Sequence, residues 1–488
     1  MSSGQRFNRL DPSSGLTIEH QGRTLLIPIH LRGFVWDACD FQRLTPVGDY
    51  QSDAFRCSYR REGAGIPLVV SRMQQPACRF ENFLPDRSVF AATFCFNAKS
   101  NLVGASQPYS FELVDPLRKD AITTSDGQQS IAKDTCAPMA YRLRDQRSTI
   151  LDQFVNPGAA GSESHLYALE PYQPGKIPVV LIHGLLSDPF TWVEMVNALQ
   201  ADPTFVQNFQ IWVFEYPTGR AFLGSAADLR QELEMIRNQF DPTHSDIALS
   251  QTVLVGHSMG GLVAKLQITD SHGQLWDAIA SQPFDRVRMP PSFSDELARS
   301  FFFKASPDVS RVVYIGTPHR GSVYARRLIG RVGAALVSPD ASNENAYRQL
   351  LESNPGIFSV EVSQGIPSSI DLLEPKSELL NAIDRLPIGT NRLQIPSRIH
   401  SVIGNSRSTV FFGRSDGVVP VSSARDFRSL TEITVDAKHS ELHKTDEAIE
   451  EVKRILSLHL LESKQNGSAR IARPRNPTEH KGPNRHFK

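Results

Sequence analysis

The spacing of apolar and polar residues changes character near residue 150. Before that point, apolar residues gather in short runs that lack a helical period and are separated by turn residues. Residues 18–27 have the pattern of a hairpin with Gly22 in its turn, and Asp126 with Gly127 marks another turn. Further strands are predicted at residues 66–70, 88–96 and 109–114. Regularly spaced short strands of this kind predict an all-β, sandwich-like N-terminal domain over residues 1–150.

From residue 177 onward, strand-like runs alternate with segments of helical spacing. Buried apolar runs predict strands at residues 177–182, 210–214, 252–255, 309–316, 398–404 and 430–436. Helical spacing predicts helices at residues 190–199, 225–240 and 446–461. Asp188 has the place of an N-cap for the first of these helices, with Pro189 at its first position. The alternation predicts a mostly parallel sheet that is covered by helices on both faces.

The boundaries of the α/β domain follow from changes in composition. Turn-rich residues 151–176 predict a linker, and the α/β domain is expected to span residues 177–463. Residues 464–488 are basic, rich in Pro and Asn and without an apolar period, so they predict a disordered tail.

Two segments of the α/β domain, about residues 270–308 and 321–396, do not fit the alternation of strands and helices. Insertions between core strands often form a cap over an active site, and we expect these segments to do so. The first contains three consecutive aromatic residues, Phe301 to Phe303, which are more typical of a core than of a lipid-binding surface.

Charge and hydropathy exclude several classes of function. Lys and Arg (52) balance Asp and Glu (52), so there is no electrostatic reason to expect a nucleic-acid partner. No apolar run has the length of a membrane span, and residues 1–10 contain no hydrophobic stretch that could serve as an export signal. As the sequence is written we expect a cytoplasmic protein, with the cell envelope as the alternative if its start is truncated.

The five cysteines all lie in the first third of the chain, at positions 39, 57, 78, 95 and 136. Scattered structural thiols are the favoured interpretation, and one or two disulfides in an exported protein are the alternative. No Cys-x-x-Cys spacing indicates a metal or redox site.

The motif with the clearest chemical meaning is Gly-His-Ser-Met-Gly at residues 256–260. It follows a predicted strand directly and precedes an apolar, helix-competent segment. Strand, sharp turn and helix in that order form a nucleophile elbow, whose strained turn needs small neighbours such as Gly256 and Gly260. A tight turn without chemistry is the alternative for the pentapeptide alone. In this context the motif predicts Ser258 as a nucleophile.

A serine hydroxyl needs a base to remove its proton as it attacks, usually a histidine held by a carboxylate. Downstream of Ser258, Asp416 lies in a loop after a strand and His439 directly follows the last predicted strand. We predict Asp416 as the acid and His439 as the base. His443 is the alternative base, but it lies further along, where the final helix begins. Glu441 is one place off the His-Glu-x-x-His pattern, so neither a metal nor another cofactor is expected.

Attack on a carbonyl also needs N–H donors for the oxyanion that develops. The backbone N–H of Met259, directly after the nucleophile, is one predicted donor. The loop after the first core strand supplies the other, and the Leu185 amide is our candidate. His183 is predicted to brace this loop, and His319 is predicted to be structural.

Four motifs together resemble bacterial lipase/esterase-like members of the α/β-hydrolase superfamily: His-Gly-Leu, Gly-His-Ser-Met-Gly-Gly, Thr-Pro-His-Arg-Gly-Ser and Ser-Asp-Gly-Val-Val-Pro. The third motif also resembles lipases and the inositol deacylases that act on glycolipid anchors. The resemblance covers about residues 177–461 and implies an α/β-hydrolase fold with cap insertions. Carried over by position, it implies Ser258 as nucleophile, Asp416 as acid, His439 as base, and Leu185 with Met259 at the oxyanion hole.

These patterns predict a serine hydrolase of carboxylic esters, esterase- or lipase-like, that works through an acyl-enzyme intermediate. The apolar insertions favour a small-molecule or lipid ester over a peptide, with contact to a membrane surface left open. An acyltransferase or an amidase would use the same triad, and a non-catalytic binding protein could keep the fold. The acyl group, the alcohol group, the oligomeric state and the role of the N-terminal domain are left open by the sequence.

Overall fold

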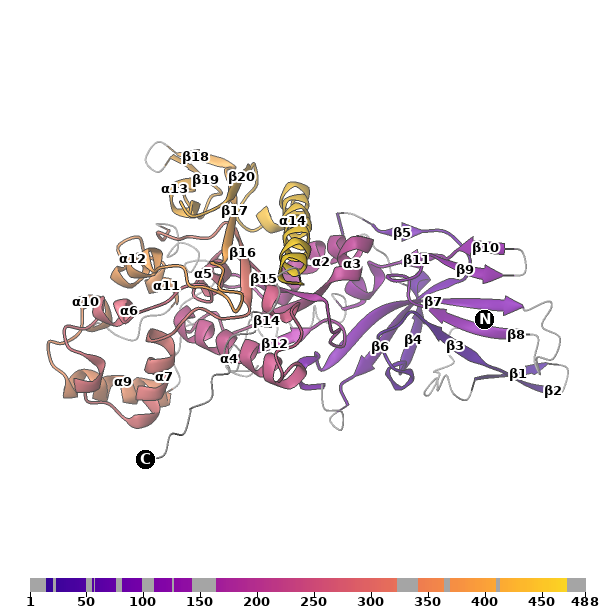
Figure 1. Cartoon of the computed structure of the whole chain (residues 1–488), viewed down its shortest axis with the longest axis horizontal. Coiled ribbons are helices and arrows are strands. Elements are labelled where there is room, and N and C mark those ends of the chain that lie inside the picture. Colours follow the sequence, from indigo (N-terminus) through magenta and orange to yellow (C-terminus); the bar gives the residue numbers. More distant parts are fainter. Residues whose placement is uncertain are drawn as a thin grey trace, which may run out of the picture.

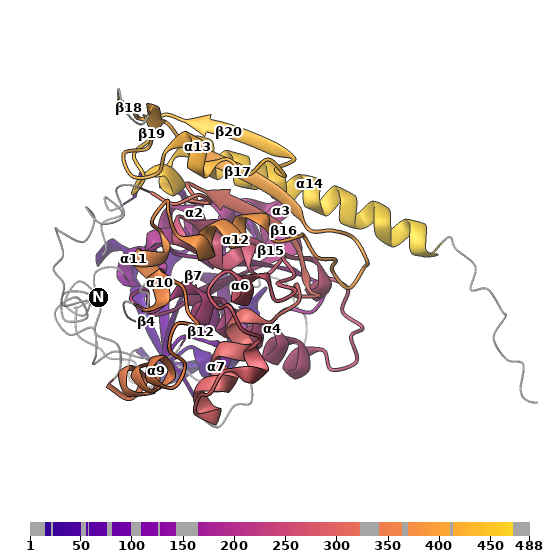
Figure 2. The same cartoon turned by 90° about the vertical axis from the view of Figure 1, so that its left-hand side faces the viewer.

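The computed structural model describes residues 15–20, 23–49, 55–56, 58–75, 81–98, 109–124, 127–142, 164–322, 341–363, 369–409 and 413–471. The strands of the first third of the chain lie together on one side of the molecule, in indigo and purple, and the α/β part lies on the other (Figure 1). Figure 2 shows the same arrangement after a turn of 90°, with the long C-terminal helix running out along one side.

The α/β part is built on a seven-stranded sheet with the order β12-β14-β13-β15-β16-β17-β20. Its strands are β12 (His165–Ala168), β13 (Ile177–Ile182), β14 (Phe209–Glu215), β15 (Thr252–His257), β16 (Val309–Ile315), β17 (Arg398–Gly404) and β20 (Thr431–Val435). β12 pairs antiparallel with β14, and the other neighbours in the sheet are parallel. The predicted mostly parallel sheet is therefore confirmed, and each of its predicted strands has a counterpart.

Helices cover both faces of this sheet. They are α2 (Val193–Gln200), α3 (Pro203–Asn208), α4 (Phe222–Phe240), α5 (Met259–Lys265) and α14 (Asp446–Ile471), with the short helix η5 (Leu249–Gln251) before β15. Side chains of a strand alternate between its two faces. In β13, Val180 and Ile182 accordingly join the apolar cluster that includes α4 and α5. Val179 and Leu181 join the cluster that includes α2, α3 and α14.

Two helix ends differ from the prediction. The helix expected at residues 190–199 starts with a 3₁₀ turn, η4 (Pro189–Trp192), and the Asp188 side chain caps it by accepting the Phe190 N–H at 2.8 Å. At the other end of the domain, α14 continues to Ile471, past Lys464 where the disordered tail was predicted to begin. Each residue added to an existing helix gains one hydrogen bond, so a long helix can extend beyond its apolar stripe. Residues 472–488 lie outside the described residues.

The N-terminal region is strand-rich, as predicted. Its largest sheet has the order β3-β8-β7-β6-β4, formed by β3 (Ile29–Arg32), β8 (Tyr109–Val114), β7 (Arg87–Ala98), β6 (Ile66–Met73) and β4 (Arg43–Pro46). Three two-stranded ladders accompany it: β1 (Leu16–His20) with β2 (Arg23–Ile27), β9 (Ala121–Thr124) with β10 (Gly127–Ser130), and β5 (Arg60–Arg61) with β11 (Lys133–Asp134). The predicted hairpin thus exists as the pair β1–β2, while its turn, with Gly22, lies outside the described residues. Asp126, the first residue of the second predicted turn, also lies outside the described residues. Short helical segments complete the region: η1 (Ala38–Asp40), η2 (Val47–Asp49), η3 (Glu81–Phe83) and residues 137–142.

The N-terminal sheet and the α/β part share apolar contacts. The ring of Phe83 lies 5.2 Å from that of Phe240 and 6.4 Å from that of Trp212, measured between centroids. Arg118 also forms a bidentate ion pair with Glu170, with N–O distances of 2.9 and 2.7 Å. His165–Ala168, which the sequence placed in the linker, forms β12 of the main sheet instead. So short a strand gives little periodic signal of its own.

The two predicted insertions contain several helices each among the described residues, and they pack on each other. The first contains α6 (Gln274–Asp277), η6 (Phe284–Arg286) and α7 (Pro291–Phe301), and the second contains α9 (Ala341–Ser353), α10 (Val360–Ser363), α11 (Ser369–Leu372) and α12 (Glu378–Arg385). The buried Trp276 ring meets Phe301 and Phe358 edge-on, so it joins both insertions. Phe301 is therefore in the core, as predicted, whereas Phe302 is 40% exposed. That the insertions cap an active site stays a prediction.

Within the part of the chain that the structure describes, no helix combines the length and the apolar character needed to cross a bilayer. Cys39 is exposed, Cys95 and Cys136 are buried, and each is a thiol. Cys57 and Cys78 lie outside the described residues.

Candidate active site

Ser258 lies in a sharp turn between β15 and α5, at the middle of the main sheet. Its backbone has φ +54° and ψ −125°, a conformation that non-glycine residues rarely adopt. The Ser258 N–H donates to the Ile315 carbonyl at 2.8 Å, which ties the turn to the neighbouring strand β16. The turn therefore has the geometry that the sequence predicted for an elbow.

The glycines around Ser258 are required by contacts that a side chain would break. A Cβ atom on Gly256 would lie 2.5 Å from the Gly260 oxygen, and one on Gly260 would lie 2.3 Å from the Ile182 oxygen. A Cβ atom on Gly261 would lie 1.8 Å from Oγ1 of Thr317. These distances are far below van der Waals contact, so the first turn of α5 packs directly against the sheet and the loop after β16.

The structure brings Ser258, His439 and Asp416 into one hydrogen-bonded chain. The distance from Ser258 Oγ to His439 Nε2 is 2.8 Å, and the distance from His439 Nδ1 to Asp416 Oδ2 is 2.7 Å. Because a carboxylate accepts, the Nδ1–H of His439 donates to Asp416, which leaves Nε2 to accept the serine proton. Asp416 directly follows the hairpin of β18 (Arg407–Thr409) and β19 (Gly413–Ser415), and His439 follows β20. Three residues from separate segments, two of them directly after β15 and β19 and the third after β20, thus meet in one hydrogen-bonded chain.

The backbone around Asp416 fixes its carboxylate. Oδ1 accepts the N–H groups of Val418 at 2.9 Å and Val419 at 2.7 Å, just before α13 (Val421–Ala424), while Oδ2 faces His439. A Cβ atom on Gly404 would lie 2.5 Å from the Asp416 Cβ, so the end of β17 packs closely against this side chain. Sequence reasoning missed this packing, although a glycine at the end of a predicted strand was its signal.

His443, the alternative base, is directed away from Ser258. It lies in η8 (Leu442–Lys444), where its Nε2 is 2.7 Å from Thr191 Oγ1 and 3.1 Å from the Thr191 carbonyl oxygen. Its side chain is buried, and burial lowers its pKa to about 3. The ring nitrogen within reach of Ser258 is therefore that of His439.

The loop after β13 lies against the nucleophile. A Cβ atom on Gly184 would be 2.9 Å from the Cβ of Ser258, so the backbone before Leu185 approaches the serine closely. His183 is buried beneath the loop, its ring stacks on Tyr216 at 4.4 Å, and burial lowers its pKa to about 4. The Tyr216 hydroxyl donates to the His183 carbonyl at 2.7 Å, consistent with a bracing role for this histidine. Leu185 and Met259 flank Ser258 on two segments, and their use as oxyanion donors stays a prediction.

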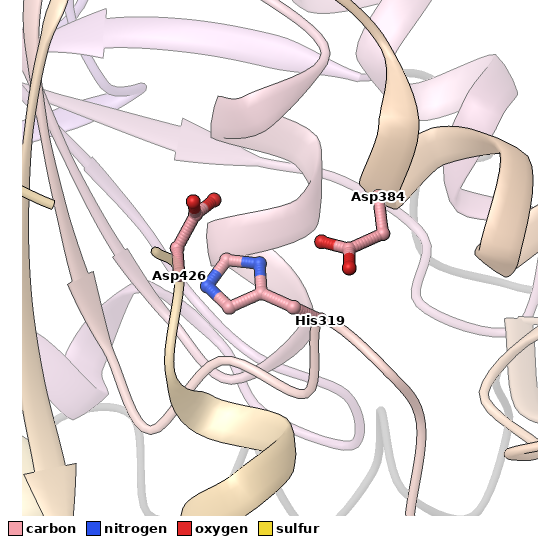
Figure 3. Close-up of side chains that lie close together, drawn as sticks. All are labelled: His319, Asp384 and Asp426. Atoms are coloured by element: carbon pink, nitrogen blue, oxygen red, sulfur yellow. The ribbon is translucent and has the colours of Figure 1, made fainter. Parts of the chain in front are cut away.

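A second cluster of ionisable groups, drawn in Figure 3, lies at the C-terminal end of α5. One ligand atom from each of His319, Asp384 and Asp426 lies within 4.8 Å of the others, close enough among the described residues to hold a metal ion. The fully buried ammonium of Lys265 already occupies their midst, 2.6 Å from Asp384 Oδ1, 3.3 Å from His319 Nδ1 and 3.5 Å from Asp426 Oδ2. Arg428 also pairs with Asp426 and Arg320 with Asp384, so the two carboxylates face three cations. The cluster is thus a buried ion-pair network, and His319 is structural, as predicted.

Comparison with known proteins identifies the fold family. The model of the alpha/beta hydrolase family matches residues 179–422, half of the chain, including Ser258 and Asp416. The chain belongs to the alpha/beta hydrolase family. The predicted family is thereby confirmed.

Solved structures that resemble this hydrolase include lipases and esterases. The mature form of the lipase BlEst2 from Bacillus licheniformis is 17% identical with a TM-score of 0.35, and the match covers 60% of this chain and 98% of that one. Esterase B from Lactobacillus rhamnosis is 13% identical with a TM-score of 0.34, over 69% of this chain and 98% of that one. A lipase-esterase related protein from Clostridium acetobutylicum is 12% identical with a TM-score of 0.29, over 60% and 98% respectively. No curated protein matches the sequence.

Proposed function

We propose that this α/β hydrolase is a serine hydrolase of carboxylic esters. The observation that carries the proposal is the hydrogen-bonded chain from Ser258 through His439 to Asp416, at 2.8 and 2.7 Å. A serine, a histidine and a carboxylate so connected have the geometry of acyl-transfer triads.

In the proposed reaction, Ser258 Oγ attacks the ester carbonyl carbon while His439 Nε2 takes the hydroxyl proton. Asp416 accepts the Nδ1–H of His439 throughout, so it holds the required tautomer and stabilises the imidazolium that forms. His439 then gives its proton to the departing alkoxide, which leaves as the alcohol and an acyl group on Ser258. A water molecule, deprotonated by His439, then attacks the acyl carbon, the bond to Ser258 Oγ breaks, and His439 returns the proton to Ser258 Oγ as the carboxylic acid leaves.

As Ser258 attacks, the carbonyl oxygen of the ester becomes negatively charged and needs N–H donors. We assign this role to the backbone N–H groups of Met259 and Leu185. Met259 is the first residue of α5, so its amide lies at the positive end of the helix dipole. Leu185 follows Gly184, whose backbone approaches Ser258 closely, which supports this assignment.

We further propose an ester with an apolar acyl or alcohol part as the substrate. The two insertions between core strands are held together by aromatic residues around Trp276, with Phe302 partly exposed. Apolar surface of this kind suits an ester chain better than a peptide.

The test compares wild type, Ser258→Ala and the control Ser363→Ala, whose serine is exposed on α10. Wild type and the control should hydrolyse p-nitrophenyl esters and react with a fluorophosphonate, whereas Ser258→Ala should do neither while keeping its circular dichroism spectrum. Turnover in Ser258→Ala equal to wild type would overturn the proposal, as would a wild type that neither hydrolyses esters nor reacts with the probe. Matched amides and alcohol acceptors in the same assay separate an amidase or an acyltransferase from an esterase.

A further inference from the structure

His257, the residue before the nucleophile, makes a contact that its sequence position does not suggest. Its Nε2 lies 2.9 Å from the backbone carbonyl oxygen of His439. A carbonyl oxygen can only accept, so His257 must carry its proton on Nε2 and donate it. The side chain adjacent to Ser258 therefore holds the backbone of the residue that we propose as the base.

The rest of the His257 ring is enclosed. Its Nδ1 is buried without a hydrogen-bond partner among the described residues, and a Cβ atom on Gly184 would lie only 3.3 Å from it. On another side the His443 ring lies 4.2 Å away between centroids, and His443 is itself bound to Thr191. The ring is thus packed between the Gly184 loop, the His439 loop and η8. The buried His257 side chain is therefore held in place on several sides while it bonds to the His439 carbonyl.

The backbone of His439 is held at both of its polar groups. Its N–H donates to the Asp416 carbonyl at 3.0 Å, and its carbonyl accepts from His257. The first bond ties the proposed base to the proposed acid. The second ties it to β15, the strand that ends at the nucleophile. With both in place, the backbone of His439 cannot shift relative to Ser258 without breaking a hydrogen bond.

We infer that His257 is a positioning residue, which keeps His439 Nε2 at hydrogen-bonding distance from Ser258 Oγ by holding the His439 carbonyl. The inference rests on the proposed function. His257 does not touch the reacting atoms, so its effect falls on the rate of acyl transfer rather than on substrate binding. A misplacement of about 1 Å between reacting groups can lower a rate by about 100-fold.

The sharpest test compares two amides, His257→Gln and His257→Asn. The Gln side-chain nitrogen occupies roughly the place of the histidine Nε2 and can donate to the His439 carbonyl, whereas the shorter Asn places its nitrogen near Nδ1. We expect His257→Gln to keep kcat for a p-nitrophenyl ester within a few-fold of wild type. We expect His257→Asn to lower kcat by about 10- to 100-fold with KM changed by less than about 2-fold.

The matched control is His459→Asn. His459 lies on α14 and is also buried. Its Nε2 is 2.8 Å from the backbone carbonyl oxygen of Gln251, so it makes the same kind of bond as His257 without being adjacent to Ser258 in sequence. It should lose stability without a comparable loss of kcat per folded molecule, with the folded fraction measured by circular dichroism. The rate of fluorophosphonate labelling gives a second measure of Ser258 reactivity in every variant.

The inference is overturned if His257→Asn keeps the wild-type kcat, if Gln restores no more activity than Asn, or if His459→Asn loses as much kcat as His257→Asn. A failure of the proposed function is seen separately, because wild type would then show neither ester turnover nor labelling.

Discussion

The fully buried Lys265 forms an ion pair of 2.6 Å with Asp384, which lies 119 positions further along the sequence. Lys265 ends α5, the helix that begins directly after Ser258, and Asp384 lies on α12 of the second insertion. The Lys265 ammonium nitrogen lies within 3.5 Å of Asp384, His319 and Asp426. This contact therefore links the proposed nucleophile's helix to the second insertion.

Lys265→Met should destabilise the fold strongly. The substitution removes the buried cation. Asp384 then keeps only its contact to Arg320, at the longer distance of 3.4 Å, as an ion pair. Removing one partner of a buried ion pair costs about 3–5 kcal/mol. Urea unfolding of Lys265→Met against wild type measures the loss, with the surface variant Lys453→Met as a control for removing a lysine. Equal stabilities would contradict the assignment of an ion-pair network.

Metal chelation should change neither stability nor activity. The position that a cation would take between His319, Asp384 and Asp426 is filled by the Lys265 ammonium, and a divalent ion there would face the repulsion of Lys265 and Arg428. Thermal unfolding with EDTA, and separately with added Zn²⁺, should give the same midpoint as without either. A midpoint that falls with EDTA and recovers with Zn²⁺ would show that this prediction is wrong.

Asp416→Asn should lower kcat by about 10³- to 10⁴-fold, with KM nearly unchanged. The Asn oxygen should take the place of Oδ1, because that position accepts two backbone N–H groups from Val418 and Val419. The Asn NH₂ then faces His439 Nδ1, which must accept instead of donate, and Nε2 holds the proton that it should receive from Ser258. Steady-state ester kinetics measure the effect, and circular dichroism confirms that the fold is kept. A loss below 10-fold would argue against the proposed role of Asp416.

Gly261→Ala should be destabilising and partly rescued by Thr317→Gly. The added methyl group would lie 1.8 Å from Thr317 Oγ1, an overlap that costs about 1–3 kcal/mol or more, and removing the threonine side chain relieves it. Gly260→Ala is the contrasting variant, because its methyl group would meet the backbone oxygen of Ile182, which no substitution removes. A double-mutant cycle from denaturant unfolding gives the coupling energy. Additive effects of Gly261→Ala and Thr317→Gly would refute the predicted overlap.

Stability should fall as the pH is lowered from about 6.5 toward 4, through buried histidines. Burial lowers the pKa values of His400, His443 and His459 to about 3, from an ordinary value of 6.5. Between these values the unfolded chain binds a proton that the folded chain does not, so the free energy of unfolding rises with pH over this range. Each histidine should cost about 2 kcal/mol on going from pH 7 to pH 5. Urea unfolding at pH 7, 6 and 5 measures how the free energy of unfolding changes with pH. His443→Gln should make this dependence shallower. An unchanged dependence in the variant would contradict the buried neutral state of His443.

The elbow, the order of strands and helices and the position of His439 beside Ser258 could be predicted because their signals are local. A β-branched run before Gly256, a cap at Asp188 and a histidine directly after a strand are each read within a few residues. The strained backbone of Ser258 was expected for the same reason.

Contacts between distant segments could not be predicted. Lys265 reads as an ordinary helix residue, and its burial depends on Asp384 and Asp426, which only the folded sheet and the second insertion bring near. His257 was read as part of a motif, while its partner, the His439 carbonyl, is 182 residues away. A backbone carbonyl leaves no trace in a sequence, so this bond required coordinates.

Strand β12 has a practical consequence for anyone shortening the chain. A fragment that started at Ile177, where the α/β pattern begins, would lack His165–Ala168. The β14 edge at Trp212–Glu215 would then present unsatisfied amide and carbonyl groups beside the apolar side chains of Trp212 and Phe214. Exposed strand edges with unpaired backbone groups can pair with strands of other molecules. Such a fragment would be prone to precipitate, and a cut placed before residue 164 would avoid this.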